Sequence, residues 1–254
     1  DKLFDNIVNL YEHPENPKYN PETVKLKSHS PVMILMNVAQ IMRSVGINAK
    51  KYDAVAGKMA HELLTGGFIN DEVHALLESP SLDGSLCDTT MGRHINPGHA
   101  LETAWFLMAE GDITGNDELI KAGFKIVDIS MPIGYDKKHG GLIQFADAKG
   151  YPATPLEWDM KLWWPQCEAI ISNLYAYKIS GDEKYKKAYD ELAEYTFSHF
   201  PDEEYGEWFG YLHYDGTVSH TLKGNLFKGP FHIPRMLMTL HCLEEDGNLI
   251  RYFK

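Results

Sequence analysis

The amino-acid sequence predicts an all-α protein in which buried helices alternate with half-exposed ones. Apolar residues recur at helical spacing in about eight segments along the chain. Some of these segments are almost wholly apolar and others are amphipathic, which suits an inner ring of helices surrounded by an outer ring. Strands and helices do not alternate, so a doubly wound α/β fold is disfavoured.

The expected helices follow one another with short interruptions. The chain opens without a methionine in an amphipathic helix over residues 3–11, so we expect the natural N-terminus to lie upstream. Pro31 begins an almost wholly apolar helix over 31–42, because proline suits the first helical position. Further helices are expected near 50–64, 97–110, 116–130, 162–180, 183–199 and 230–244. Two β-prone segments, 140–145 and 208–212, interrupt them, and a hairpin-type turn over 214–217 follows the second.

Composition excludes several classes of protein. The 254 residues are 44% hydrophobic and 12% aromatic, which is enough for a sizeable core. A net charge of −12 argues against nucleic-acid binding, which needs a basic surface. No run of about 18 apolar residues is present, so no membrane span is expected. The three cysteines match neither a zinc-binding spacing nor a disulfide framework, which favours reduced thiols and a cytoplasmic location.

The most informative segment begins a helix at residue 96. Asn96 is a good N-cap, and Pro97 suits the first helical position. His99 and Glu102 are three residues apart and therefore share one face of this helix. An imidazole and a carboxylate on its first turns can thus meet one ligand.

Two later segments carry residues of matching chemistry. His232 follows Pro230 at another helix start, with Arg235 three residues further on. Trp164 and Glu168 are four residues apart, so they place an aromatic face and a carboxylate on one helix stripe. Two histidines at helix starts favour a two-base proton-transfer enzyme, because the ordinary imidazole pKa of about 6.5 lies near working pH.

Three blocks of sequence carry a resemblance to a known family. They read NPGHALETAWF from residue 96, LEWDMKLWWPQCEA from residue 156, and EWFGYL from residue 207, which runs on to FKGPFHIPR ending at residue 235. In order and spacing these blocks resemble the N-acylglucosamine 2-epimerase family, over about residues 30–240. The resemblance implies an (α/α)6 toroid barrel with its site in the central cavity. Residues 1–254 would form a single domain, the C-terminal two-thirds of that barrel, without the first third and its further substrate-binding arginine.

The resemblance also implies an activity. Such an enzyme inverts C2 of N-acylglucosamine and N-acylmannosamine by removing a proton from the ring-opened sugar and returning it to the opposite face. His99 and His232 match the acid/base pair. The matching substrate-binding residues are Glu102, Trp164, Glu168 and Arg235. The resemblance further implies a cytoplasmic homodimer that acts on a small amino sugar, requires no cofactor and has ATP as an activator. No metal-ligand cluster stands out in the sequence.

Each supporting residue has an expected role. Glu102 would orient His99 or bind a sugar hydroxyl, because a neighbouring carboxylate raises the basicity of an imidazole. Glu168 would hold a hydroxyl or the second histidine. Arg235 would bind the anomeric or ring oxygen, or stabilise the enolate formed when the proton leaves. The segment 223–229 has two lysines among glycines and could face phosphate, but a lysine-bearing turn is the commoner explanation for such a pattern.

Other functions stay open at this point. An aldose–ketose isomerase or a cellobiose 2-epimerase uses related chemistry, but those enzymes have a histidine where this chain has Met33. Gln166 and Cys167 also depart from the mammalian-like pattern, which leaves the substrate preference open. A glycoside hydrolase would use a carboxylate pair drawn from Glu102, Asp159 and Glu168, but it leaves the two histidines unexplained. A non-catalytic protease-binding protein is a further alternative.

Overall fold

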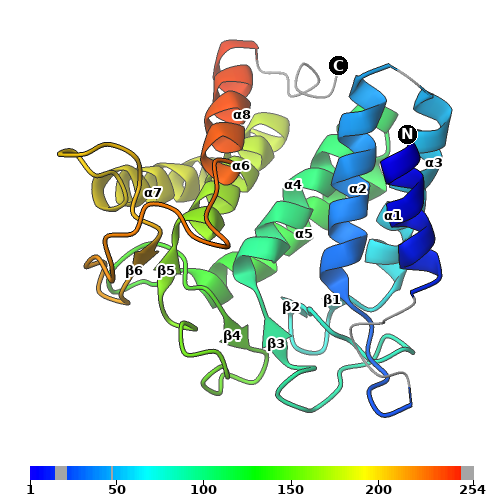
Figure 1. Cartoon of the computed structure of the whole chain (residues 1–254), viewed down its shortest axis with the longest axis horizontal. Coiled ribbons are helices and arrows are strands. Elements are labelled where there is room, and N and C mark those ends of the chain that lie inside the picture. Colours follow the sequence, from blue (N-terminus) through cyan, green and yellow to red (C-terminus); the bar gives the residue numbers. More distant parts are fainter. Residues whose placement is uncertain (15–21, 47, 247–254) are drawn as a thin grey trace.

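The computed structural model describes residues 1–14, 22–46 and 48–246, and eight helices lie within these ranges (Figure 1). Four helices form an inner row: α2 (His29–Ser44), α4 (Pro97–Thr114), α6 (Trp163–Ser180) and α8 (His232–Asp246). The other four are α1 (Lys2–Glu12), α3 (Ala49–Thr65), α5 (Asp117–Gly134) and α7 (Glu183–His199). Each inner helix from α2 to α6 packs against the helix that follows it in the chain. All eight expected helices are thereby confirmed.

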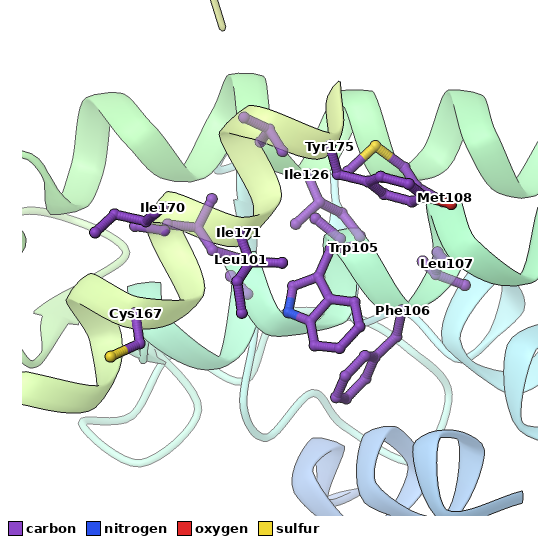
Figure 2. Packing of buried hydrophobic residues seen from close by; sticks show 14 of the residues in the cluster. Leu101, Trp105, Phe106, Leu107, Met108, Ile126, Cys167, Ile170, Ile171 and Tyr175 are labelled. Carbon is purple, nitrogen blue, oxygen red and sulfur yellow. The ribbon is translucent and has the colours of Figure 1, made fainter. Parts of the chain in front are cut away.

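The two central helices, α4 and α6, form the core. Nearly every residue of α4 from Pro97 to Gly111, and of α6 from Trp163 to Ala176, is buried. A helix that is apolar all round has to be enclosed on all sides. Figure 2 shows Leu101 and Trp105 of α4 together with Ile171 of α6 in one packed cluster. These two helices therefore hold their side chains rigidly, including those that carry the site.

Glycine allows α5 to lie directly against α4. A Cβ at Gly123 would lie 2.4 Å from Cγ of Met108 and 2.7 Å from the carbonyl oxygen of Ala104. Any larger residue would push the two helices apart. The close pairing of an inner with an outer helix thus depends on this position.

Side-chain caps explain where several helices begin. The side-chain oxygen of Asn96 accepts a hydrogen bond from the backbone N–H of His99 at 3.2 Å, as expected for an N-cap. Asn116 and Asp182 cap α5 and α7 in the same way. Helix α2 begins at His29, two residues before the expected start, because Pro31 is tolerated within the first turn.

Three short antiparallel strand pairs lie at one end of the helices (Figure 1). They are β1 (Ile69–Asn70) with β2 (Ala75–Leu76), β3 (His94–Ile95) with β4 (Ala146–Asp147), and β5 (Lys161–Leu162) with β6 (Tyr211–Leu212). Strand β3 leads into α4, and β5 leads directly into α6. Two of the three strand pairs therefore anchor the starts of the two central helices.

The expected β-segments are only partly found. The expectation of a strand over 140–145 is wrong, because that segment makes a single bridge, between Tyr135 and Leu142. Gly140 and Gly141 have φ of +78° and +74°, so the chain turns there instead of extending. The segment 208–212 ends in β6, and the turn that follows it returns to a bridge between Leu212 and Val218.

A buried ion pair fastens the start of α6 to its surroundings. Lys161 Nζ lies 2.8 Å from Asp136 Oδ2, and the Tyr214 hydroxyl donates to the other oxygen of Asp136 at 3.0 Å. Burial lowers the pKa of Lys161, although Asp136 favours its charged form.

Among the described residues, no helix has the length and apolar content needed to cross a membrane.

Candidate active site

A cavity of about 920 Å³ lies where the inner helices begin. Its lining includes Met33 of α2, His99 and Glu102 of α4, Trp164 of α6, and His232 of α8. Four inner helices thus direct their first turns at one space. The cavity therefore brings together residues that are far apart in the sequence.

Both histidines lie against the same aromatic ring. The ring centroid of Trp164 is 5.1 Å from that of His99 and 5.5 Å from that of His232. The side chains of the two histidines are 27% and 21% exposed, so both reach the cavity. A Cβ at Gly98 would lie 2.6 Å from the Trp164 ring, so glycine at this position lets the indole approach α4.

Glu78, which follows β2, holds His99. The Nδ1 atom of His99 lies 2.9 Å from Glu78 Oε1, and Nδ1 of His29 lies 3.4 Å from the same oxygen. Nε2 of His29 is in turn 2.9 Å from the hydroxyl of Thr103. Burial alone would lower the pKa of His99, but the Glu78 carboxylate outweighs it and raises that pKa. Burial would likewise raise the pKa of Glu78, yet His99 and His29 hold it well below its usual range.

Glu168 of α6 holds His232 in a similar way. Its Oε1 lies 2.8 Å from Nδ1 of His232, and its Oε2 accepts a hydrogen bond from the indole N–H of Trp105 at 2.9 Å. Burial would raise the pKa of Glu168, but Arg235 and His232 hold it at about 2. This carboxylate is therefore charged throughout the neutral range.

Arg235 lies behind the histidines and joins three helices. Its Nη2 donates to Glu168 Oε1 at 2.7 Å and to Glu102 Oε1 at 2.5 Å. The guanidinium also packs over the rings of Trp105 and Phe231. The side chain is only 3% exposed, so Arg235 binds the two carboxylates and does not line the cavity.

This arrangement can exchange protons on two sides of one ligand. A carboxylate at Nδ1 favours the tautomer that has its proton on Nδ1 and leaves Nε2 free to accept another. His99 and His232 both have such a carboxylate, supplied by separate elements. Two imidazole bases facing one cavity are suited to removing and returning a proton on carbon.

The structure brings together all six residues selected from the sequence. His99, Glu102, Trp164 and His232 line the cavity, with Glu168 and Arg235 directly behind them. Glu102 does not bond to His99, because its carboxylate pairs with Arg235 and Glu78 takes the orienting position instead.

Sequence reasoning missed Glu78 and His29. Neither residue has a helical spacing to His99 that could have revealed it. The available signal was only a carboxylate at the end of the apolar run 75–77.

Other residues considered from the sequence lie elsewhere. Gln166 is fully buried; its amide oxygen accepts a hydrogen bond from the Leu142 N–H and its amide nitrogen donates to the Leu142 carbonyl, so it supports the fold outside the cavity. Asp159 lines a separate pocket. Lys223 and Lys228 form ion pairs with Asp202 and Glu207.

The chain is similar in sequence to a known family of proteins. Residues 1–230 match the model of the family described as N-acylglucosamine 2-epimerase (GlcNAc 2-epimerase). The chain belongs to this family. It is 42% identical over 226 residues to N-acylglucosamine 2-epimerase of Bos taurus, covering 87% of this chain and 51% of the bovine protein. It is 41% identical over 254 residues to the human protein of the same name, covering 98% and 58% of the two chains.

Solved structures agree on the fold of this epimerase-family chain. A D-mannose isomerase superposes with a TM-score of 0.74 at 20% identity, over 87% of this chain and 55% of the isomerase. A sugar epimerase from a ruminal bacterium gives a TM-score of 0.70 at 20% identity, over 84% and 53%. The expected α/α toroid fold is confirmed. The chain spans about half the length of the curated relatives it matches.

Proposed function

We propose that this protein is an epimerase that interconverts N-acylglucosamine and N-acylmannosamine by moving the proton at C2. The observation that carries the proposal is the pair His99 and His232, which lie against one indole ring and are each tied through Nδ1 to a buried carboxylate. Membership of the family supports the same reaction.

In the proposed mechanism, one imidazole removes the C2 proton of the ring-opened sugar and the other, as imidazolium, supplies a proton to the opposite face. A positioned acid or base of this kind is typically worth about 10²–10⁴ in rate. The negative charge of Glu78 stabilises the imidazolium of His99, and Glu168 does the same for His232. Arg235 acts through Glu168 and Glu102, because its guanidinium donates a hydrogen bond to each of these two carboxylates.

An N-acyl substrate is favoured by the wall that α2 contributes. Met33 and Ile34 line the cavity there, and their apolar side chains suit an acyl methyl group. Glu102 lines the same cavity and is the proposed contact for a sugar hydroxyl.

Glycoside hydrolysis is less well supported. That reaction needs a carboxylic acid that holds its proton near neutral pH. Arg235 and His232 lower the pKa of Glu168 to about 2, so Glu168 does not hold this proton near neutral pH. Glu102 is engaged in an ion pair with Arg235. Asp159 lines another pocket.

We also propose a cytoplasmic homodimer that ATP activates. Cys87, Cys167 and Cys242 are all free thiols, which supports a reducing compartment. Dimer formation and activation by ATP rest on the resemblance, and light scattering and an assay with added ATP test them.

Proton NMR in D2O tests the proposed reaction. The protein is incubated with N-acetylmannosamine, with and without ATP, and we expect N-acetylglucosamine carrying deuterium at C2. His99→Ala and His232→Ala should each lower the conversion by at least about 100-fold. A ketose product would indicate an aldose–ketose isomerase, and an absence of exchange at C2 with any aldose would overturn the epimerase proposal.

A further inference from the structure

His29, Glu78 and His99 form a compact group that the proposed reaction uses only in part. One ligand atom from each residue can be chosen so that all three lie within 4.8 Å of one another. The Nδ1 atoms of both imidazoles face the same carboxylate oxygen, at 2.9 Å for His99 and 3.4 Å for His29. His29 lies on α2, Glu78 lies in the segment after β2, and His99 lies on α4.

His29 supplies the observation that points to a ligand. Its side chain is fully buried, and its Nδ1 atom makes no well-aligned hydrogen bond among the described residues, although Glu78 Oε1 lies 3.4 Å away. Its other ring nitrogen is held by the Thr103 hydroxyl at 2.9 Å. An imidazole fixed through one nitrogen, with the other directed at a carboxylate and a second imidazole, is the usual setting of a metal ligand.

The structure holds a second group of possible metal ligands, and the charge around Glu78 distinguishes the first group from it. Glu102, Glu168 and His232 also lie close together, but Arg235 already supplies a positive charge between the two carboxylates. Glu78 is paired with no arginine or lysine in the part of the chain that the structure describes, only with His29 and His99. A cation other than a proton is therefore best accommodated beside Glu78.

We propose that His29, Glu78 and His99 bind a divalent transition-metal ion, with Zn²⁺ as the best match. Two imidazole nitrogens and a carboxylate oxygen are a typical zinc donor set. In a tetrahedral site with bonds of about 2.0–2.1 Å, neighbouring ligand atoms lie about 3.3 Å apart. The two distances to Glu78 bracket this value. Glu78 and His99 line the cavity, so water can provide the fourth ligand.

Binding there would inhibit the enzyme. A metal on Nδ1 of His99 leaves the remaining ring proton on Nε2, and a neutral ring in that state cannot accept the substrate proton. The bound ion also draws electron density from the ring. This consequence rests on the proposed function, whereas the binding of the metal does not.

Titration of the protein with ZnCl₂ against a chromophoric chelator tests the site. All forms carry Cys87→Ser and Cys242→Ser, because these two partly exposed thiols would compete for the metal. We expect one Zn²⁺ per chain, with binding at least about 100-fold weaker in His29→Gln and in Glu78→Gln. Glutamine at position 29 removes Nδ1 but keeps an amide that can reach Thr103. His232→Gln, in the group that contains Arg235, is the matched control and should bind Zn²⁺ like the parent.

Co²⁺ gives an independent reading. Tetrahedral Co²⁺ bound at this site should show visible absorption bands that are absent in His29→Gln, and thermal unfolding checks that each variant is folded. Equal Zn²⁺ affinity in His29→Gln and the parent would overturn the proposal, as would equal loss of affinity in His232→Gln.

Inhibition is measured separately, as the fraction of each form's own C2 exchange that remains with Zn²⁺. The parent should lose its exchange and recover it with excess chelator, while His29→Gln should keep its fraction. Zinc binding at the site without any C2 exchange in the metal-free protein would leave the site standing and overturn only the epimerase function.

Discussion

The indole ring of Trp164 and the imidazole ring of His99 lie with their centroids 5.1 Å apart, although the two residues belong to different helices. His232, from a third helix, lies 5.5 Å from the same indole. One rigid aromatic ring therefore sets the spacing of both proposed bases. The approach of this ring depends on Gly98, where a Cβ would lie 2.6 Å from it.

We expect Gly98→Ala to destabilise the protein, although the helix propensity of alanine is more favourable than that of glycine by about 1 kcal/mol. The added methyl group would press on Trp164 and on Pro165, both of which belong to a packed helix start. Gly57→Ala is the matched control, because nothing lies within 4 Å of a Cβ at this exposed position of α3. Denaturant unfolding should show opposite signs for the two variants; stabilisation by both would contradict the packing described.

Removing the guanidinium of Arg235 should be strongly destabilising. Arg235→Met would leave Glu102 and Glu168 buried without their cation, and breaking a buried ion pair in this way costs about 3–5 kcal/mol. Lys186→Met removes one partner of an exposed pair with Asp190 and should cost less than about 1 kcal/mol. The free energy of unfolding of each variant measures this contrast, and similar losses in both would refute it.

The charge on Glu168 should make stability depend on pH in acid. Burial disfavours that charge, but Arg235 and His232 lower the pKa of Glu168 from 4.5 to about 2. A lowered pKa contributes stability that is present above about 4.5 and is lost as the pH falls toward about 2.

Glu168→Gln should therefore be less stable than the parent at pH 6, by an amount on the order of 3 kcal/mol. The difference should shrink steadily between about pH 4.5 and pH 2. Unfolding curves collected across this range provide the measurement, and a difference that does not vary with pH would disprove the assignment.

Neutralising Glu78 should lower the pKa of His99. Burial already favours the neutral imidazole, and Glu78 contributes the largest opposing effect, with smaller ones from Glu102 and Glu168. In Glu78→Gln we expect the pKa of His99 to move below its present raised value, which nitrogen-detected NMR of the imidazole can follow. Glu157→Gln changes another carboxylate of the same cavity lining and should leave that pKa in place.

The helices could be predicted from the sequence because each has a local signature. The apolar segments of α4 and α6 are long, and Asn96, Asn116 and Asp182 supply caps where the helices begin. The strands could not be predicted in the same way. Each has two residues, and their pairing joins segments such as 94–95 and 146–147 that carry no shared pattern.

The site residues likewise fall into those with a local sequence signal and those without one. His99 and His232 were recognisable because each stands at a helix start within a longer block that resembles the family, and local spacing placed Glu102 and Arg235 near them in the sequence. The partner of His99 is a different matter. Glu78 lies 21 residues away at the end of a short strand, and its closeness to His99 depends on how that strand packs against α4.

The sequence by itself thus determined the eight helices, their order, the Asn96 cap and the two candidate bases, because helix periodicity and capping act over a few residues. Only the tertiary structure decided which carboxylate holds which histidine, that Arg235 is enclosed between Glu102 and Glu168, and that His29 lies next to Glu78. These contacts form between elements distant in the chain, and they depend on the packing of α2, α4, α6 and α8 around one cavity.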